Sequence, residues 1–236
     1  MTSTALVTGG SRGIGRAVVE RLAAAGHRVV FTYARDKVAA DEVVARCPGA
    51  VAVQADQTEL SCLDAMFAPV DEGLDILVNN AGVIVPAAIA DVTADEFDRA
   101  MTANTKVPLL AIGRAAALMR DGGRIVNIST LNTMMPAPGN VLYCASKAAL
   151  EQVTAVAARE LGPRGITVNT VSPGATDTAL LRAHNTDEEL ARSAALTALG
   201  RLGQPDDVAA VVAFLTTPDA GWITGQNIRA TGGLLV

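Results

Sequence analysis

Short apolar runs alternate with longer segments of helical periodicity from one end of the chain to the other. The runs are rich in Val, Ile and Leu and are mostly continuous, which is the pattern of strands buried on both faces of a parallel sheet. They cover residues 4–8, 28–33, 50–54, 74–79, 123–129, 166–172 and 226–230. We predict a strand at each of these places.

The segments between the runs carry the pattern of amphipathic helices. In residues 13–25 the apolar positions recur about every 3.6 residues, and Gly26 follows as a stop signal. Further helices are expected over 37–47, 94–120 and 142–162. Strands and helices that alternate in this way build βαβ units with right-handed crossovers. The fold class is therefore α/β: a doubly wound (Rossmann) parallel sheet of about seven strands with helices on both faces.

Half of the 236 residues are hydrophobic and no linker or repeat is present, so residues 1–236 are predicted to form a single domain. Nineteen Lys and Arg against 24 Asp and Glu give a net charge of −5, which argues against a nucleic-acid surface. Two histidines and three widely spaced cysteines predict neither a metal site nor a disulfide framework. Neither a signal peptide nor a membrane span is evident, so we expect a cytoplasmic protein.

In a doubly wound sheet, ligands bind beyond the carboxyl ends of the strands. Directly after the first predicted strand comes TGGSRGIG, from Thr8 to Gly15. Gly9, Gly13 and Gly15 would let the backbone approach a pyrophosphate at the start of a helix, where negative charge is favoured. The spacing is not G-x-G-x-x-G, and such a loop can be only a tight turn. Its place between a strand and a helix favours a nucleotide.

The end of the second predicted strand bears on the kind of nucleotide. An acid there would bind the ribose 2′-hydroxyl of NAD, but Tyr33 stands where that acid is expected. Asp36 lies past the strand and is better placed as the N-cap of the helix over 37–47. Arg12 and Arg35 offer guanidinium groups to a 2′-phosphate, although each could be an ordinary solvated side chain. Together these residues favour NADP(H), with NAD(H) as the alternative.

Tyr143 and Lys147 lie four residues apart in a predicted helix and therefore share one face. A phenol has an ordinary pKa near ~10. A neighbouring ammonium group favours the phenolate and lowers that pKa toward neutral pH, where general acid catalysis is most effective. The lysine could also donate to ribose hydroxyls. The alternative is a surface pair on an amphipathic helix, and only the surrounding motifs argue against it.

Four motifs occur in order along the chain: TGGSRGIG, NNAG at 79–82, YCASK from Tyr143 and SPG at 172–174. With this set the chain resembles the single-domain short-chain dehydrogenase/reductase (SDR) family, and in particular its 3-oxoacyl-carrier-protein reductases. The resemblance covers essentially the whole chain and ends with WITGQNIRATGG. It implies a nicotinamide cofactor and a catalytic tetrad of Asn, Ser, Tyr and Lys.

The tetrad corresponds here to Asn104, Thr130, Tyr143 and Lys147. The resemblance implies that Asn104 anchors a water that relays protons to the lysine; without it, a mid-helix polar residue facing solvent would be expected. The serine is replaced, because its position, thirteen residues before the tyrosine, holds Thr130. Threonine keeps a hydroxyl for a substrate carbonyl, while its methyl group stiffens χ1 and narrows the site. Ser129 is the alternative, although strand alternation would point it to the other side.

The resemblance also implies the contacts of the cofactor. Asp56 would meet the adenine edge, residues of NNAG would form a wall, and the loop from Pro173 to Thr178 would embrace the nicotinamide carboxamide. By themselves these residues would be turn formers. The full expected set is Gly9, Ser11, Arg12, Gly13, Ile14, Gly15, Arg35, Asp56, Asn79, Ala81, Gly82, Tyr143, Lys147, Pro173, Gly174, Thr176 and Thr178.

The expected activity is hydride transfer between NADP(H) and a carbonyl or alcohol, with the tyrosine as general acid or base. Residues 179–203 resemble the substrate lid of the family, and their Ala and Leu content, with Met134 and Met135, favours an apolar ketone, oxoacyl or polyketide substrate. Such a substrate could be carrier-bound, although no basic cluster marks a docking site. The alternatives are a non-catalytic NADP(H)-binding scaffold or sensor, and a dehydratase or epimerase on the same fold.

The resemblance further implies a homotetramer. The helices over 94–120 and 142–162 would pair across one two-fold axis, and the apolar GGLLV at 232–236 would lie near another. The sequence does not distinguish a dimer from a tetramer. We expect neither a nucleic acid nor a membrane as a partner.

Overall fold

The computed structural model describes residues 3–70 and 73–234, and its centre is a seven-stranded parallel sheet of order β3-β2-β1-β4-β5-β6-β7. The strands are β1 (Thr4–Val7), β2 (Arg28–Tyr33), β3 (Val51–Gln54), β4 (Leu74–Asn79), β5 (Met119–Ile128), β6 (Thr167–Pro173) and β7 (Asn227–Ala230). All seven predicted strands are present, β2 and β4 with the predicted bounds. The doubly wound α/β fold is confirmed.

The strand order reverses at β1, which pairs with β2 on one side and with β4 on the other. Ala5 is the Cα partner of Val29 in β2 and of Ile76 in β4. The carboxyl ends of β1 and β4 therefore lie side by side. This is the crevice where open α/β sheets bind ligands, and it brings TGGSRGIG next to NNAG.

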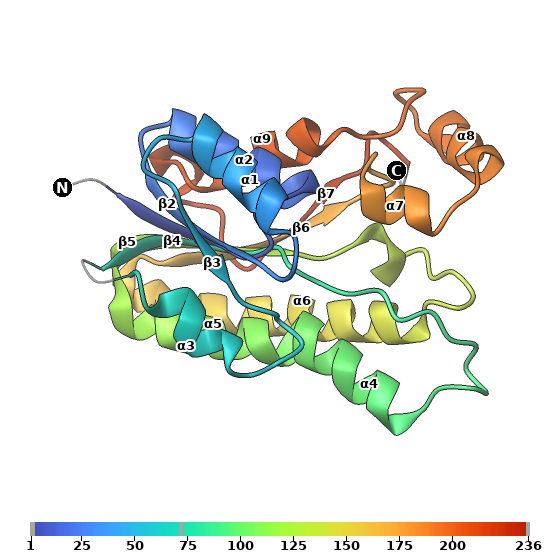
Figure 1. The fold of residues 1–236 in the computed structure, drawn as a ribbon, viewed down its shortest axis with the longest axis horizontal. Coiled ribbons are helices and arrows are strands. Elements are labelled where there is room, and N and C mark those ends of the chain that lie inside the picture. The colour runs from blue at the N-terminus through green and yellow to red at the C-terminus, as the bar shows by residue number, and fades with distance from the viewer. Residues whose placement is uncertain (1–2, 71–72, 235–236) are drawn as a thin grey trace.

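Helices cover both faces of the sheet (Figure 1). One face carries α1 (Gly13–Ala24), α2 (Lys37–Arg46) and α9 (Pro205–Leu215). The other carries α3 (Cys62–Phe67), α4 (Ala94–Met101), α5 (Val107–Leu118) and α6 (Val141–Leu161). Among the described residues, none of these helices is long and apolar enough to cross a bilayer.

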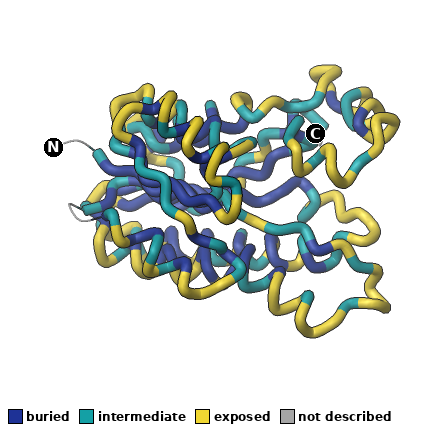
Figure 2. The backbone as a smooth tube through the Cα atoms, in the orientation of Figure 1, coloured by how far each residue is buried: buried dark blue, intermediate teal, exposed yellow. Residues whose placement is uncertain are grey.

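Successive residues of a strand contribute to opposite cores, as the two-residue period of a strand requires. In β1, Ala5 and Val7 pack on the side of α1, whereas Leu6 packs on the side of α6. The inner strands form the most deeply buried layer of the molecule, whereas the outer strands β3 and β7 are partly exposed (Figure 2). Because a shift by one residue would exchange the two faces, these cores fix the register and hence which residues emerge at the carboxyl edge.

The predicted helix over 94–120 is interrupted, which corrects the expectation of one continuous helix. α4 ends at Met101, a π-helical turn follows over Thr102–Lys106, and α5 ends at Leu118, where β5 begins. Pro108 explains the irregularity in part, since it has no N–H to donate to the carbonyl of Asn104 four residues earlier.

The predicted lid, residues 179–203, forms two short helices, α7 (Ala179–Ala183) and α8 (Asp187–Leu196), beyond the carboxyl end of β6 (Figure 1). Its two stems are tied together at the base. The Gly203 N–H donates to the carbonyl oxygen of Ala175 at 2.9 Å, and the Asp177 N–H donates to that of Gly203 at 2.8 Å. The two ends of the lid are therefore held together by backbone hydrogen bonds.

Candidate active site

The loop after β1 has a conformation that glycine adopts most readily. Gly9 and Gly13 have φ values of +69° and +54°. A Cβ atom at Gly15 would lie 2.2 Å from the carbonyl oxygen of Gly9, and one at Gly9 would lie 3.1 Å from Ala81. Among the described residues, no side chain caps the start of α1 and its first turn holds no acid. The loop thus leaves a helix N-terminus for an anion, which fits the pyrophosphate of a dinucleotide.

Two residues that the sequence reasoning missed fasten this loop to the segment after β4. The Thr8 hydroxyl oxygen accepts from the N–H groups of Asn80 and Ala81, at 3.0 and 2.9 Å. The Asn80 amide donates to the carbonyl oxygens of Thr8 and Gly9, at 2.9 and 3.2 Å. Polar residues directly after neighbouring strands were the available signal, because parallel strands end at one edge.

Asn79, in contrast, is bonded to the neighbouring strand β5. Its side chain is buried in the sheet and donates to Asn127 at 2.8 Å. Gln57, unlike Asn79, is absent from the predicted set; it is buried and donates to the carbonyl oxygens of Ala81 and Ala103, at 3.1 and 2.7 Å. The backbone after β4 is therefore fixed at Ala81 by the side-chain amide of Gln57.

At the adenosine end, each predicted arginine lies beside a carboxylate. Arg12 is 3.6 Å from Asp36, and Arg35 is 4.0 Å from Asp56, with side chains that are 63% and 85% exposed. Hydrogen bonds from Thr58, the backbone N–H first, lower the pKa of Asp56. Asp36 caps α2, as predicted, accepting from the Ala39 N–H at 3.0 Å.

The strand β2 ends at Tyr33, whose side chain is buried in the core on the α1 side. This strand end therefore carries no carboxylate. Exposed guanidinium groups with only loose partners are compatible with a 2′-phosphate at this end. The crevice as a whole fits a phosphorylated dinucleotide.

Lys147 lies on α6 and is completely enclosed. Its ammonium group donates to the carbonyl oxygen of Ile128, at the end of β5, at 2.7 Å. Burial lowers the pKa of Lys147 to about 8, against an opposing effect of the Glu151 carboxylate. A Cβ atom at Gly82 would lie 3.2 Å from the lysine nitrogen and 2.9 Å from the Asn104 side-chain oxygen. Gly82 therefore separates these two predicted site residues and has to be small.

Tyr143 is half-buried, and the Thr130 hydroxyl lies on the side of its phenol. Burial raises the pKa of Tyr143, and the hydrogen bond from Thr130 lowers it without reversing the effect. The expected lowering of this pKa by Lys147 is therefore not found. The raised pKa keeps the phenol protonated at neutral pH, as a proton donor requires.

The hydroxyl groups of Thr130 and Ser129 point to different partners. Ser129 donates to the Glu151 carboxylate at 2.6 Å. The Thr130 hydroxyl oxygen accepts from the Asn132 N–H at 3.2 Å, which leaves its hydrogen for the phenol side. Thr130 thus shares the crevice with Tyr143, and the divergence follows the alternation of a strand.

Asn104 is fully buried, so the solvent-facing alternative is wrong. Its side-chain oxygen accepts from the Val83 N–H at 2.8 Å, and its amide donates to the Val83 carbonyl and the Ser146 hydroxyl, both at 2.9 Å. These bonds connect the π-helical turn to α6. Because Pro108 offers no N–H, the backbone carbonyl of Asn104 lacks the donor of a regular α-helix.

The loop after β6 begins the lid. The Gly174 N–H donates to the carbonyl oxygen of Ala230 at 3.0 Å. The Thr176 hydroxyl donates to the carbonyl oxygen of Gly174 at 3.0 Å, and the Thr178 hydroxyl accepts from the Leu181 N–H at 3.2 Å. A Cβ atom at Gly13 would lie 3.3 Å from the Thr178 methyl group. The start of the lid therefore faces the glycine-rich loop.

Residues 9–235 match the protein family described as enoyl-(acyl carrier protein) reductase, which places almost the whole chain within one family. The chain belongs to the short-chain dehydrogenase/reductase family. The resemblance deduced from the four motifs is confirmed.

Similar proteins differ in what their names say they do. The angucycline C-6 ketoreductase LanV, solved with bound NADP, is 42% identical, with a TM-score of 0.92 over 99% of this chain and 95% of that one. A cyclic-di-GMP-binding biofilm dispersal mediator protein of Escherichia coli is 42% identical over 94% of this chain and 92% of its own. A 3-oxoacyl-[acyl-carrier-protein] reductase of Synechocystis is 36% identical over 98% of this chain and 96% of its own.

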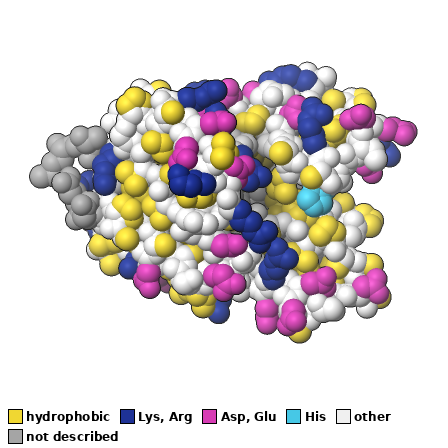
Figure 3. All heavy atoms as spheres, viewed as in Figure 1, with side chains coloured by type: hydrophobic (Ala, Val, Ile, Leu, Met, Phe, Trp, Pro, Cys, Tyr) yellow, Lys and Arg dark blue, Asp and Glu magenta, His cyan; other side chains and the backbone are white. Residues whose placement is uncertain are grey.

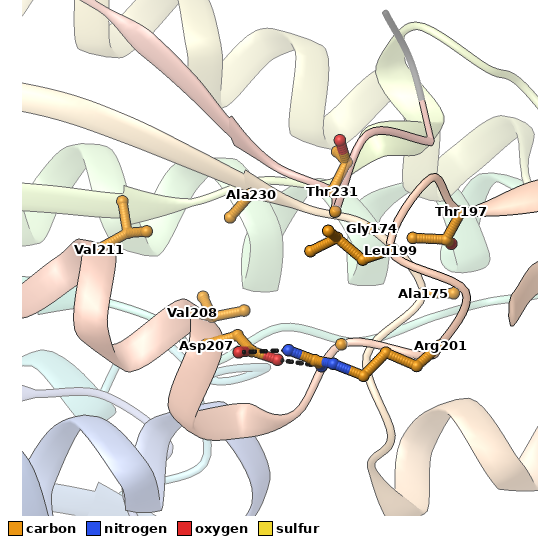
Figure 4. A pocket seen from close by; sticks show the side chains of 12 residues that line it. Gly174, Ala175, Thr197, Leu199, Arg201, Asp207, Val208, Val211, Ala230 and Thr231 are labelled. Carbon is orange, nitrogen blue, oxygen red and sulfur yellow. Dashed lines mark hydrogen bonds and ion pairs between the residues drawn. The ribbon is translucent and has the colours of Figure 1, made fainter.

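In this SDR, the base of the lid encloses a small cavity of about 180 Å³ behind Gly174 (Figure 4). Thr197 and Leu199 of the lid stem and Val208 of α9 line it. Arg201 closes one side through two hydrogen bonds to Asp207, at 2.6 and 2.9 Å. The ion pair supports the base of the lid, and the cavity is lined in part by Gly174, one of the expected cofactor contacts.

Exposed apolar side chains belong to the segments that border the crevice. Met134 and Met135 follow Thr130, and Leu180 lies on α7; their exposed fractions are 51%, 44% and 47%. The surface is hollowed between the lid and the helices below it, and hydrophobic side chains gather around the hollow (Figure 3). Large exposed apolar groups at a hollow are typical of a ligand site.

The enclosed ammonium of Lys147 gives a prediction for stability. Its pKa of about 8 in the folded chain lies below the ordinary 10.5. The unfolded chain therefore binds more protons between these values, and stability rises with pH across that window. Below pH 8 the buried charge costs stability, so Lys147→Met should raise the unfolding free energy at pH 7 by about 1–3 kcal/mol.

The advantage of Lys147→Met should shrink as the pH rises to 10, as urea unfolding at both values would measure. Lys106→Met, at an exposed position of the same protein, is the matched control. A Lys147→Met variant that is less stable than wild type at pH 7 would contradict the assigned cost of the buried charge.

Proposed function

We propose that this SDR is an NADP(H)-dependent oxidoreductase that reduces the carbonyl group of an apolar substrate, with Tyr143 as the general acid. One observation carries the proposal: Tyr143 lies one helical turn before the buried Lys147, whose ammonium donates to the carbonyl oxygen of Ile128 at 2.7 Å, two residues before Thr130. This group of side chains sits where β5 ends, at the edge of the sheet that carries the glycine-rich loop. Reduction is the favoured direction, and the reverse oxidation would use the same groups.

Thr130 and Tyr143 would act on the substrate oxygen. The Thr130 hydroxyl has a hydrogen to donate, because its oxygen already accepts from Asn132, so it can bind a carbonyl oxygen and favour the charge that develops there. The protonated phenol of Tyr143 then gives its proton to that oxygen. Ser129 is the less suitable candidate for this role, since its hydroxyl is directed to Glu151.

Lys147 and Asn104 would support the tyrosine. Lys147 would stabilise the phenolate once Tyr143 has given up its proton, an effect that is not seen in the resting site, where the pKa of Tyr143 is raised. Lys147 is held for this by the Ile128 carbonyl. Asn104 would assist proton resupply through a water bound at its backbone carbonyl, because its side chain is committed to Val83 and Ser146.

The cofactor would lie along the crevice from Arg35 to Gly174. The glycine-rich loop and the start of α1 would hold the pyrophosphate, and Asp56 the adenine edge. Arg12 and Arg35 would bind the 2′-phosphate, and each would then exchange a carboxylate partner for a phosphate. When bound, the nicotinamide supplies the hydride, and the protein supplies orientation and charge.

The substrate class is proposed from the apolar border of the crevice. Met134, Met135 and Leu180 offer apolar and polarizable surface to a ring system or acyl chain. Similarity to the ketoreductase LanV and to a 3-oxoacyl-[acyl-carrier-protein] reductase supports a polyketide or oxoacyl ketone, free or carrier-bound.

Two other readings remain as outcomes of the test. The relative described as cyclic-di-GMP-binding supports a binding protein or sensor without chemistry. A dehydratase or epimerase on the same fold would use the cofactor without consuming it. The intact group of Tyr143, Lys147 and Asn104 favours the reductase, because a protein that only binds has no need of a proton donor.

The role of Tyr143 is tested by NADPH oxidation with a panel of polycyclic ketones, oxoacyl thioesters and simple apolar ketones. Because the phenol supplies the proton, Tyr143→Phe should lower kcat at least ~100-fold while NADPH still binds. Tyr33→Phe, which changes the other tyrosine of the chain in the core, is the matched control.

Equal turnover in Tyr143→Phe and wild type would remove the phenol as the acid. If neither protein oxidises NADPH with any ketone, although both bind cyclic-di-GMP or NADPH, the sensor would be favoured. Conversion of a substrate without stoichiometric loss of NADPH would favour the dehydratase or epimerase.

The choice of cofactor depends on the two arginines. Arg35→Ala and Arg12→Ala should each raise the KM for NADPH about 10-fold, because a charge-assisted hydrogen bond to the 2′-phosphate is lost. The KM for NADH should stay nearly unchanged. Arg46→Ala, at the exposed end of α2, is the control. An equal loss for both cofactors would show that the arginines support the fold and not the phosphate.

We also propose a homotetramer, with α5 and α6 in one subunit interface. A groove of about 520 Å³ runs between these helices, lined by Leu109, Gly113, Val153 and Val156. Light scattering should give four chain masses, and Val156→Glu should reduce that number because it places a charge in the groove. Val38→Glu, on exposed α2, is the control. A wild-type monomer at micromolar concentration would contradict this assembly.

A further inference from the structure

Glu151 is a half-buried carboxylate of α6 that the proposed reaction does not use. It follows Tyr143 and Lys147 at intervals of four residues, so the three side chains lie along one face of the helix. Its carboxylate accepts from the Ser129 hydroxyl at 2.6 Å and from the Thr133 hydroxyl at 2.8 Å. Both bonds are charge-assisted and short, and they leave the helix for another segment of the chain.

The two hydroxyl groups flank Thr130. Ser129 precedes it at the end of β5, and Thr133 ends the short 3₁₀ turn Leu131–Thr133 that follows. Thr133 shares its hydroxyl hydrogen between Glu151 and the carbonyl oxygen of Thr130, which is 3.1 Å away. The segment that carries Thr130 is therefore fastened on both sides to one carboxylate of α6. This sets where the Thr130 hydroxyl stands relative to the phenol of Tyr143.

The Glu151 carboxylate also counteracts the lowering of the Lys147 pKa by burial. Around the ammonium lie the Ile128 carbonyl, Gly82 and the Asn104 amide, all uncharged. On α6, Tyr143 is the other ionisable group of this face, and it is protonated at neutral pH. Among the described residues, Glu151 is the charged group that acts on the pKa of Lys147, and it raises that pKa against desolvation.

We propose that Glu151 is a positioning residue of this active site, which fastens the Thr130 segment to α6 and provides the counter-charge of the buried Lys147. The inference rests on the proposed reductase function for its kinetic consequences. Its structural part, the coupling of Glu151 with Lys147, holds for the protein with or without turnover.

Glu151→Gln separates charge from anchoring, because the amide oxygen still accepts from both hydroxyl groups. With NADPH and a reducible ketone, the alkaline limb of kcat should move to lower pH by about 0.5–1 unit, since Lys147 loses its proton earlier. KM at pH 6.5 should stay close to that of wild type. Glu42→Gln, on exposed α2, removes one carboxylate elsewhere and should leave the pH profile in place.

The double variant Ser129→Ala, Thr133→Val removes the anchoring and keeps the charge. It should lower kcat/KM about 10-fold at every pH, because the Thr130 hydroxyl is misplaced, without moving the alkaline limb. A Glu151→Gln profile that coincides with wild type, or that falls equally at all pH values, would overturn the counter-charge. Wild-type kinetics in the double variant would overturn the anchoring.

A measurement without turnover keeps this inference distinct from the proposed reaction. Unfolding free energies of wild type, Glu151→Gln, Lys147→Met and the combined variant form a double-mutant cycle. The cycle should give a favourable coupling between the two side chains at pH 7 that is lost at pH 10, where Lys147 is neutral. If wild type reduces no ketone, the reductase proposal fails, while coupling at pH 7 still supports Glu151. An absence of coupling at pH 7 overturns its role as counter-charge even in an active enzyme.

Discussion

Lys147 brings a positive charge into the interior of the molecule, next to one backbone carbonyl, two uncharged neighbours and one carboxylate. A charge in such a place is costly unless the surrounding groups are held rigidly, because solvent can no longer compensate for a poor contact. The site therefore depends on how firmly α6 is placed against the end of β5. Much of the polar interior of this protein serves that placement.

A chain of buried hydrogen bonds fixes α6 against the sheet. Asn79 in β4 donates to Asn127 in β5, Asn127 donates to Thr154 in α6 at 2.8 Å, and Thr154 lies 2.7 Å from the hydroxyl of Thr170 in β6. Thr154 is seven residues after Lys147 and faces the same way. A displacement of α6 along its axis would leave each of these groups unpaired. This series of hydrogen bonds therefore determines which turn of the helix meets the Ile128 carbonyl.

Local patterns were sufficient to predict the sheet, because each strand of a doubly wound fold carries its own signal. β2 and β4 are buried on both faces and bounded by polar residues, and their predicted bounds agree with the structure. The capping role of Asp36 depends on a residue only three positions further along, Ala39, and was equally accessible. The motifs placed Tyr143 and Lys147 on one helix, since their relation is a matter of helical period alone.

What the sequence did not reveal depends on contacts between distant segments. The π-helical turn at Asn104 requires Val83 and Ser146, which are far along the chain in opposite directions. The pKa of Tyr143 is governed by burial, which no spacing of residues can express. Glu151 was overlooked for the same reason, because its partners come from the end of β5. Pro108 was the one local sign of the irregular turn.

Several features that are uncommon in regular secondary structure lie at the carboxyl edge of the sheet. They include the positive φ values of Gly9 and Gly13, the uncapped start of α1, the π-helical turn and the enclosed ammonium of Lys147. The π-helical turn and the enclosed ammonium are unfavourable by themselves, whereas glycines with positive φ also occur at turns elsewhere in the fold. A regular scaffold can tolerate such costs at one place only if its two cores supply the stability. The π-helical turn and the buried ammonium at the carboxyl edge therefore indicate the functional part of the molecule in addition to the motifs.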